Sequence, residues 1–201
     1  MIKKIGLTIL KWGSLLGIAM AALLRLKVYA NHLDMYSVKG IFDLLHVLLF
    51  IGALYLCIKE VRDILPDGKI AFSKAFGIGS GVSILAFFIV LGYLYLYYDI
   101  IDKTALPELN ARNYQLYTNK IAKDTISPTP TITTDTTGNT TIETSTGEKI
   151  RIPHYDNALE AALNYSFRDV LLLCMLFNIF VSAYLYRRKS IEITKQEDAP
   201  E

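Results

Sequence analysis

The stretch AFGIGSGVSILAFFIVLGYLYLYY, residues 75–98, decides the fold class of this 201-residue chain. It holds 24 residues without a charge, and as an α-helix it would be about 36 Å long at about 1.5 Å per residue. That length crosses a hydrocarbon layer of about 30 Å with some tilt. A soluble helix is seldom apolar on every side over such a length, so the stretch predicts a membrane-spanning helix.

Three further apolar blocks follow the same pattern, two of them near the lower length limit of a membrane span and one shorter, and none of the four contains a proline. They are residues 12–24, 41–58 and 170–186. The first reaches 20 residues when counted from Ile5, provided that Lys11 extends toward the headgroups. Together the blocks predict an all-α membrane protein with four transmembrane helices.

The first block has a second interpretation as a secretory signal peptide. Lys3 and Lys4 form a basic start, and Ala19-Met20-Ala21 has the small-x-small form of a cleavage site. Against this, Lys11 interrupts the apolar region and Ala22-Leu23-Leu24 continues it past the site. A retained span is the favoured interpretation, with the cleaved peptide as the alternative.

These blocks divide the chain into four parts. Residues 1–98 hold the first three spans, residues 99–169 an extracytoplasmic segment, residues 170–190 the fourth span and residues 191–201 a cytoplasmic tail.

The extracytoplasmic segment combines a helical part and a Thr-rich part. Residues 106–122 have the apolar spacing of a short amphipathic helix. Residues 125–147 hold 11 threonines, and alternating Ile132 and Ile142 around Gly138-Asn139 indicate a β-hairpin. A disordered loop is the alternative, because an isolated hairpin is marginal in water. Asn157 and Glu160 resemble a capping box that would start a helix leading into the fourth span.

Lysine and arginine residues set the expected orientation. If both termini are cytoplasmic, the inside segments 1–11, 59–74 and 187–201 hold 11 of these residues in 42 positions. The outside segments hold six in 46 positions, counted within 15 residues of the membrane for the long one. The bias follows the positive-inside rule, so we expect both termini in the cytoplasm.

Asp43 and His46 are the two titratable residues inside the second block, and at i and i+3 they share a helix face. Ionisable groups in a span suggest function by default, and here ion or proton handling is one interpretation. The other is a structural ion pair between Asp43 and Arg25 or Lys27, which close the first span. Both interpretations stay open.

Two ladders of small residues at four-residue spacing lie in the first and third blocks, which would run parallel. Such ladders let helix backbones approach closely in a bilayer, so we expect both to face other helices. Their members are Gly13, Gly17, Ala21, Ser73, Gly77 and Gly81.

The remaining residues predict neither a catalytic nor a metal site. Cys57 and Cys174 lie at different depths, so packing is favoured over a disulfide. His32 and His154 lack the spacing of metal ligands, and no motif calls for a cofactor. A net charge of +2 without a basic block gives no reason to expect nucleic acid as a partner.

The expected partners are therefore the lipid bilayer and a second membrane protein or another copy of the chain. The favoured role is a non-enzymatic structural or partner-regulating membrane component. A small transporter or channel subunit that uses Asp43 and His46 is the alternative.

A resemblance to a known family covers most of the chain. Residues 58–63 and 68–79, Lys11-Trp12-Gly13, Phe167-Arg168 and Arg187-Arg188-Lys189 resemble the bacterial membrane-protein family catalogued as domain of unknown function 4199. The resemblance implies four membrane helices in a bacterial inner membrane and carries no catalytic or ligand residue. Residues 125–152 depart from it, because similar proteins are more often helical there.

Overall fold

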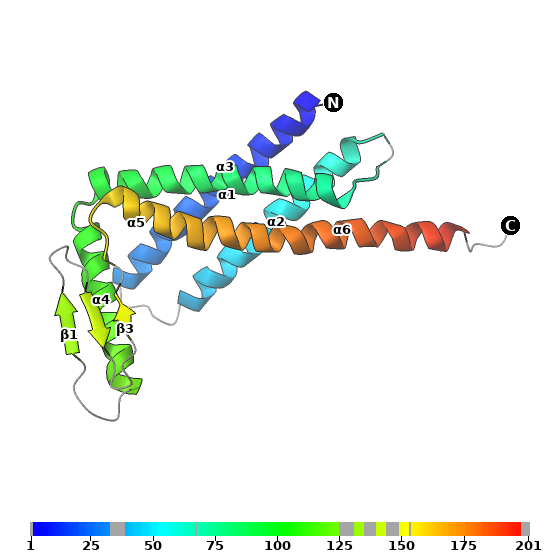
Figure 1. Ribbon diagram of the computed structural model, residues 1–201. Coiled ribbons are helices and arrows are strands. Elements are labelled where there is room, and N and C mark those ends of the chain that lie inside the picture. Colours follow the sequence, from blue (N-terminus) through cyan, green and yellow to red (C-terminus); the bar gives the residue numbers. More distant parts are fainter. Residues whose placement is uncertain are drawn as a thin grey trace. The chain divides into compact units, whose positions relative to one another are not determined.

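The computed structural model describes residues 2–32, 39–66, 68–124, 131–134, 140–143, 149–152 and 154–197. These residues form two compact units. The helix unit comprises Met1–Tyr93 with Asn164–Glu201, and the second unit comprises Leu94–Leu163. Figure 1 shows the elements of both, and each unit is described by itself below.

Four long helices make up the helix unit. They are α1 (Ile2–His32), α2 (Lys39–Ile64), α3 (Phe72–Leu96) and α6 (Leu173–Glu197). The segments Ile2–Lys27, Ile41–Ile64, Phe72–Ile101 and Ala158–Tyr186 are each long and apolar enough to cross a membrane. The chain therefore has the four apolar helices of spanning length that the sequence predicts, and α1 runs unbroken through Ala19–Ala21.

α1 and α3 are parallel and pack through a constant register. A side-chain carbon built on Gly13 would lie 2.8 Å from Leu85, and one built on Gly17 would lie 2.8 Å from Ile89. Gly81 of α3 faces Ile9 of α1 in the same way, at 3.2 Å. Each of these pairs is separated by the same 72 positions. α3 runs antiparallel to α6, and the two lie side by side in Figure 1.

The structure places the ladder of α1 against α3, but it leaves the first part of the ladder of α3 exposed. Gly13 and Gly17 contact α3, and Ala21 is 9% exposed. Ser73 and Gly77 are exposed, and nothing lies within 4 Å of a side-chain carbon built on Gly77. Helices that cross at an angle touch over a limited length. Gly81, one turn beyond Gly77, contacts α1.

Large apolar side chains fill the middle of the helix unit. Leu16 of α1 and Phe50, Leu54 and Ile58 of α2 are at most 1% exposed. Close packing gives each of these side chains many dispersion contacts. The energy of one contact is small, but the sum over many contacts is large.

The second unit holds a short helix and three strands. After η2 (Tyr97–Ile101, a π-helix), α4 covers Ala105–Asp124 and confirms the helix expected at residues 106–122. The strands β1 (Thr131–Thr134), β2 (Thr140–Glu143) and β3 (Lys149–Arg151) pair antiparallel in sequence order. Ile132 pairs with Ile142, and Ile142 with Ile150. The turn expected at Gly138-Asn139 lies outside the described residues.

Side-chain hydrogen bonds fix the start of α4. The hydroxyl and the backbone N–H of Thr104 donate to Asp102 Oδ1 over 2.7 and 3.1 Å, and Tyr97 Oη donates to Asp102 Oδ2 over 3.2 Å. These donors, led by the Thr104 hydroxyl, hold the pKa of the Asp102 carboxyl below its usual range.

The chain returns to the helix unit through a continuous helical run. α5 covers Ala158–Tyr165, the π-helix η3 covers Ser166–Leu172, and α6 follows directly. Asn157 Oδ1 accepts a 2.9 Å hydrogen bond from the Glu160 N–H, as the predicted cap requires. The Glu160 carboxylate accepts from the N–H of Asp156 rather than of Asn157.

Candidate functional site

A cavity of about 250 Å³ lies in the helix unit, where α1 ends and where α2 and the η3–α6 run begin. At roughly 30 Å³ per molecule it has room for about eight waters. We call it the polar cavity. It is lined by Met20, Lys27, Asp43, His46, Val47, Phe50, Tyr165, Asp169 and Leu173.

Local helix geometry brings the polar side chains of this cavity together. Asp43 and His46 occupy neighbouring positions on one face in the first turns of α2, as their spacing predicts. Lys27 comes from the last part of α1. Asp169 lies within η3, and π-helical turns are rare and frequently occur at functional sites. Three separate helical segments therefore contribute charged groups to one cavity.

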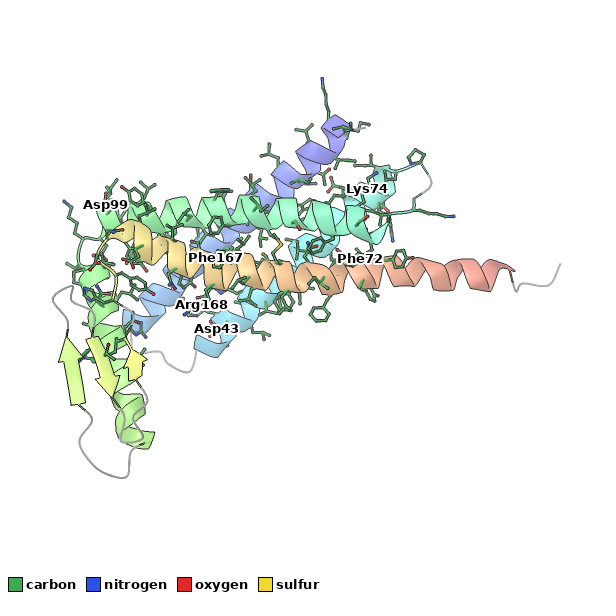
Figure 2. The ribbon with its side chains drawn as sticks, viewed as in Figure 1. Asp43, Phe72, Lys74, Asp99, Phe167 and Arg168 are labelled. Carbon is green, nitrogen blue, oxygen red and sulfur yellow. The ribbon has the colours of Figure 1, made fainter. Side chains whose placement is uncertain are left out.

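Two ion pairs involve acidic residues of the cavity. Lys27 Nζ donates to Asp43 Oδ1, so Lys27 is the partner that the structure gives to Asp43 of the two that the sequence suggested. Arg168 donates from Nε and Nη2 to the two oxygens of Asp169, over 2.7 and 3.1 Å. Figure 2 shows Asp43 and Arg168 at one end of the helix unit, with Phe72 and Lys74 at the other.

His46 uses one ring nitrogen and leaves the other unpaired. Nδ1 lies 2.8 Å from the backbone oxygen of Phe42 in the preceding turn. A carbonyl only accepts, so Nδ1 carries a proton in this bond and Nε2 is an acceptor in the neutral ring. Nε2 is buried and has no hydrogen-bond partner among the residues that the structure describes. An unsatisfied buried group costs about 1–3 kcal/mol, and a donor could reach Nε2 only after the surrounding side chains move, because the atom has almost no accessible surface.

Asn178 forms a polar contact that the sequence analysis missed. It is fully buried, and Nδ2 donates to the Phe76 backbone oxygen at 2.8 Å and to Ser80 Oγ at 3.2 Å. Its Oδ1 accepts from Ser182 Oγ at 3.2 Å. The available signal was a lone amide inside the apolar block 170–186. Its hydrogen bonds join α6 to α3, which is a structural role.

A second missed group lies at the opposite end of α2, and we call it the Glu60 cluster. The Glu60 carboxylate accepts hydrogen bonds from Trp12 Nε1 at 2.7 Å, Lys11 Nζ at 2.9 Å and Thr8 Oγ1 at 3.4 Å. All three donors come from α1. Lys11 and Glu60 flank apolar blocks, but nothing in their spacing could show that they meet.

The other candidate residues do not come together at a site. Cys57 and Cys174 are buried and form no disulfide. His154 lies 3.8 Å from Asp156 in the second unit, while the side chain of His32 lies outside the described residues. Within the part of the chain that the structure describes, no group of three or more His, Cys, Asp or Glu residues could hold a metal ion.

Comparison with known proteins places this architecture in a family. The family model described as "Protein of unknown function (DUF4199)" matches residues 11–185. The chain belongs to this family. The matched range includes all nine residues that line the polar cavity in this DUF4199 member. No curated protein matches the chain, and no solved structure matches it.

Proposed function

We propose that the protein resides in a bacterial inner membrane with both termini in the cytoplasm. Four apolar helices return the chain to its starting side. The excess of lysine and arginine in segments 1–11, 59–74 and 187–201 supports the cytoplasmic assignment of that side. The polar cavity and the second unit then belong to the extracytoplasmic side.

Cysteine labelling tests this orientation. Ala111 and Lys69 are exposed, whereas the native Cys57 and Cys174 are buried. In right-side-out vesicles, Ala111→Cys should react with a membrane-impermeant maleimide and Lys69→Cys only after permeabilisation. The unsubstituted chain is the control for background. The reverse pattern would show that the termini are extracytoplasmic.

Within this membrane setting, we propose that the protein is a non-enzymatic component that regulates a partner by binding a small molecule in the polar cavity. The observation that carries the proposal is the cavity of about 250 Å³ that charged residues of three helical segments line. Below the cavity, Leu16, Leu54 and Ile58 close the core of the helix unit. That packing favours a binding site over a conduit through one chain.

A transporter or channel subunit that uses Asp43 and His46 is the second candidate. Its support is the placement of two titratable groups in one apolar helix, at a cavity with room for water. Because the core below the cavity is closed, conduction would need a path formed between copies or a rearranged helix unit.

Purification from native membranes followed by reconstitution separates the two functions. A membrane-protein partner that co-purifies in a fixed ratio supports the regulatory role, provided that its retention changes when cavity residues are substituted. A homo-oligomer that gives pH-dependent flux in vesicles, lost in both Asp43→Asn and His46→Phe, supports transport. Asp63→Asn is the matched control, because Asp63 is an exposed acid of the same helix and lies outside the cavity.

A further inference from the structure

An apolar groove of about 400 Å³ lies between α2 and α6, and we call it the aromatic groove. It is lined by Ile51, Tyr55, Phe177, Phe180, Val181 and Tyr184. Its volume falls within the range of about 300–1,000 Å³ that is typical of ligand sites. We propose that the groove holds one acyl chain of an anionic phospholipid, whose phosphate lies beside basic residues at one end of the groove. This inference depends neither on the polar cavity nor on which side of the membrane holds the termini.

The groove extends from the middle of the helix unit toward one end. α2 and α6 both begin at the polar cavity, where Phe50 and Leu173 line it, and the groove residues follow farther along both helices. Ile51 and Lys59 are eight positions apart in α2, which is about 12 Å along a helix. One leaflet of the hydrocarbon layer is about 15 Å deep, so the groove matches an acyl chain of one leaflet.

This length also argues against a partner helix as the occupant. A membrane-spanning helix crosses the whole hydrocarbon layer of about 30 Å. The aromatic groove covers less than half of that depth, so it would contact only one part of such a helix. A chain that ends near the middle of the membrane fits the groove better.

Basic residues lie at the end of the groove that is farther from the polar cavity. Lys59 comes one turn after Tyr55 in α2, is exposed and forms no ion pair with another residue that the structure describes. Arg187 and Arg188 come three and four positions after Tyr184 in α6, which is again one turn. Basic residues next to a membrane helix attract anionic lipid headgroups, so both walls of the groove lead to a place that favours a phosphate.

The acid nearest to these basic residues in the sequence is already occupied. Glu60 accepts hydrogen bonds from three donors of α1, and its pair with Lys11 balances its charge. The end of the groove therefore keeps a positive charge. An anionic headgroup complements this charge, whereas the ammonium of a zwitterionic headgroup offsets the attraction of its own phosphate.

Quenching of a tryptophan by brominated acyl chains tests the proposal in the full-length protein. Trp12 is the single tryptophan, so Trp12→Phe gives a background without tryptophan fluorescence. In this background, Tyr55→Trp places a reporter in the groove. Phe180→Trp, from the α6 side of the groove, is a second reporter that serves if Tyr55→Trp does not fold.

Leu15→Trp is the matched control outside the groove. Lys11 pairs with Glu60, and Leu15 and Tyr55 lie four and five positions from that pair toward the polar cavity, so they have similar depths in the membrane. Leu15 is 56% exposed and does not line the groove. It therefore reports the lipid that surrounds the protein in general.

Two sets of vesicles contain phosphatidylglycerol and phosphatidylcholine in the same ratio, and only one of the two lipids is brominated in each set. Comparison of the sets gives the preference for phosphatidylglycerol at each tryptophan. We expect a preference of about fivefold or more in the groove, since one basic residue near the surface contributes an attraction of that order. At Leu15→Trp we expect almost none.

Charge variants test the role of the basic residues. The combination of Lys59→Gln, Arg187→Gln and Arg188→Gln should abolish the preference in the groove. The control variant removes the same number of charges from exposed lysines elsewhere at this end of the helix unit, Lys3, Lys4 and Lys69. It should leave the preference unchanged.

Three results would overturn the inference. An equal preference at the groove and at Leu15→Trp, or an equal loss in both charge variants, would indicate a general attraction of anionic lipid. No preference in the groove would remove the anionic headgroup. If neither brominated lipid quenches the groove tryptophan while both quench Leu15→Trp, a partner helix or a second copy of the protein covers the groove. None of these results concerns the polar cavity, so they are distinguishable from a failure of the proposed function.

Discussion

The two ends of α2 carry similar charges but differ in how completely they are satisfied. At each end an acid of α2 pairs with a lysine of α1, Glu60 with Lys11 at 2.9 Å and Asp43 with Lys27. At the Glu60 cluster, the carboxylate also accepts bonds from Trp12 and Thr8. At the polar cavity, a buried imidazole nitrogen has no partner among the described residues.

This difference separates a contact that fixes two helices from one that is available to a ligand. Donors on three side chains of α1 bond to Glu60, so the cluster ties α1 to α2. At the polar cavity, by contrast, charged residues line open volume, and the buried Nε2 of His46 has no partner among the described residues. We therefore expect substitutions in the closed part of the helix unit to lower stability, and those at the cavity to change binding.

The largest effect is expected at Gly79, in the closed part. A side-chain carbon built there would lie 1.9 Å from Asn178 Oδ1, so Gly79→Ala must displace Asn178 and disturb its bonds to α3. Overpacking of this kind costs roughly 1–3 kcal/mol, and each lost interhelical hydrogen bond adds about 0.6 kcal/mol. Thermal unfolding in detergent should show a Tm well below that of the unsubstituted protein.

Gly77→Ala is the matched control in the same helix. Nothing lies within 4 Å of its new side-chain carbon, and alanine has the higher helix propensity. Its Tm should stay level or rise slightly. Equal losses in Gly77→Ala and Gly79→Ala would contradict the packing of α3 against α6 described above.

The contrast between these two glycines shows what the sequence could and could not predict. Four apolar blocks predict four helices, because length and the absence of charge suffice for that inference. Ladder spacing selects Gly13 and Gly17, which lie against α3, and it also selects Gly77, which has no neighbour within 4 Å, but it does not select Gly79, which faces Asn178. Spacing defines a stripe on one helix, whereas the crossing of two helices decides which part of the stripe is used.

The next effect in size is expected at the Glu60 cluster. Glu60→Ala removes the acceptor shared by Trp12, Lys11 and Thr8, of which Thr8 is 5% exposed. Hydrogen bonds to a charged group contribute about 1.5–3 kcal/mol when shielded, but the Glu60 side chain is 36% exposed. Solvent screening reduces the expected loss to about 1–2 kcal/mol.

Two companion variants sharpen this prediction. Glu60→Gln retains one acceptor oxygen and should recover part of the stability, whereas Asp63→Asn should have little effect because Asp63 pairs with its neighbour Arg62 at the surface. Measurement of Tm for the three variants checks the order. A loss in Asp63→Asn as large as that in Glu60→Ala would indicate a general charge effect instead of a specific cluster.

Sequence reasoning could predict only part of the candidate site, because spacing relates residues of one helix and not residues of different helices. Asp43 and His46 stand out as titratable residues in an apolar block, and helix periodicity places them on one face. Asp169 and Tyr165 come from a segment more than 100 positions away, and no periodicity within α2 could select them. Glu60 and Asn178 were missed because a single polar residue has no spacing from which to infer its partner.

A smaller effect is expected from breaking the Lys27–Asp43 pair. Asp43→Asn should lower stability by up to about 1 kcal/mol, since the Asp43 side chain is 55% exposed and water screens the pair. A double-mutant cycle with Lys27→Met should show coupling of similar size. Additive single losses would remove the ion pair as a source of stability and favour ion handling as the reason for Asp43.

The smallest change in stability, and the sharpest contrast with Glu60, is expected for His46→Phe. The substitution loses the Nδ1 hydrogen bond to the Phe42 carbonyl, worth about 1 kcal/mol, and removes a buried unsatisfied acceptor of comparable cost. The two terms nearly cancel, so the Tm should stay within about 1 °C of that of the unsubstituted protein. A Tm loss as large as that of Glu60→Ala would mean that Nε2 has a stabilising partner, and the polar cavity would then be a structural contact of the same kind as the Glu60 cluster.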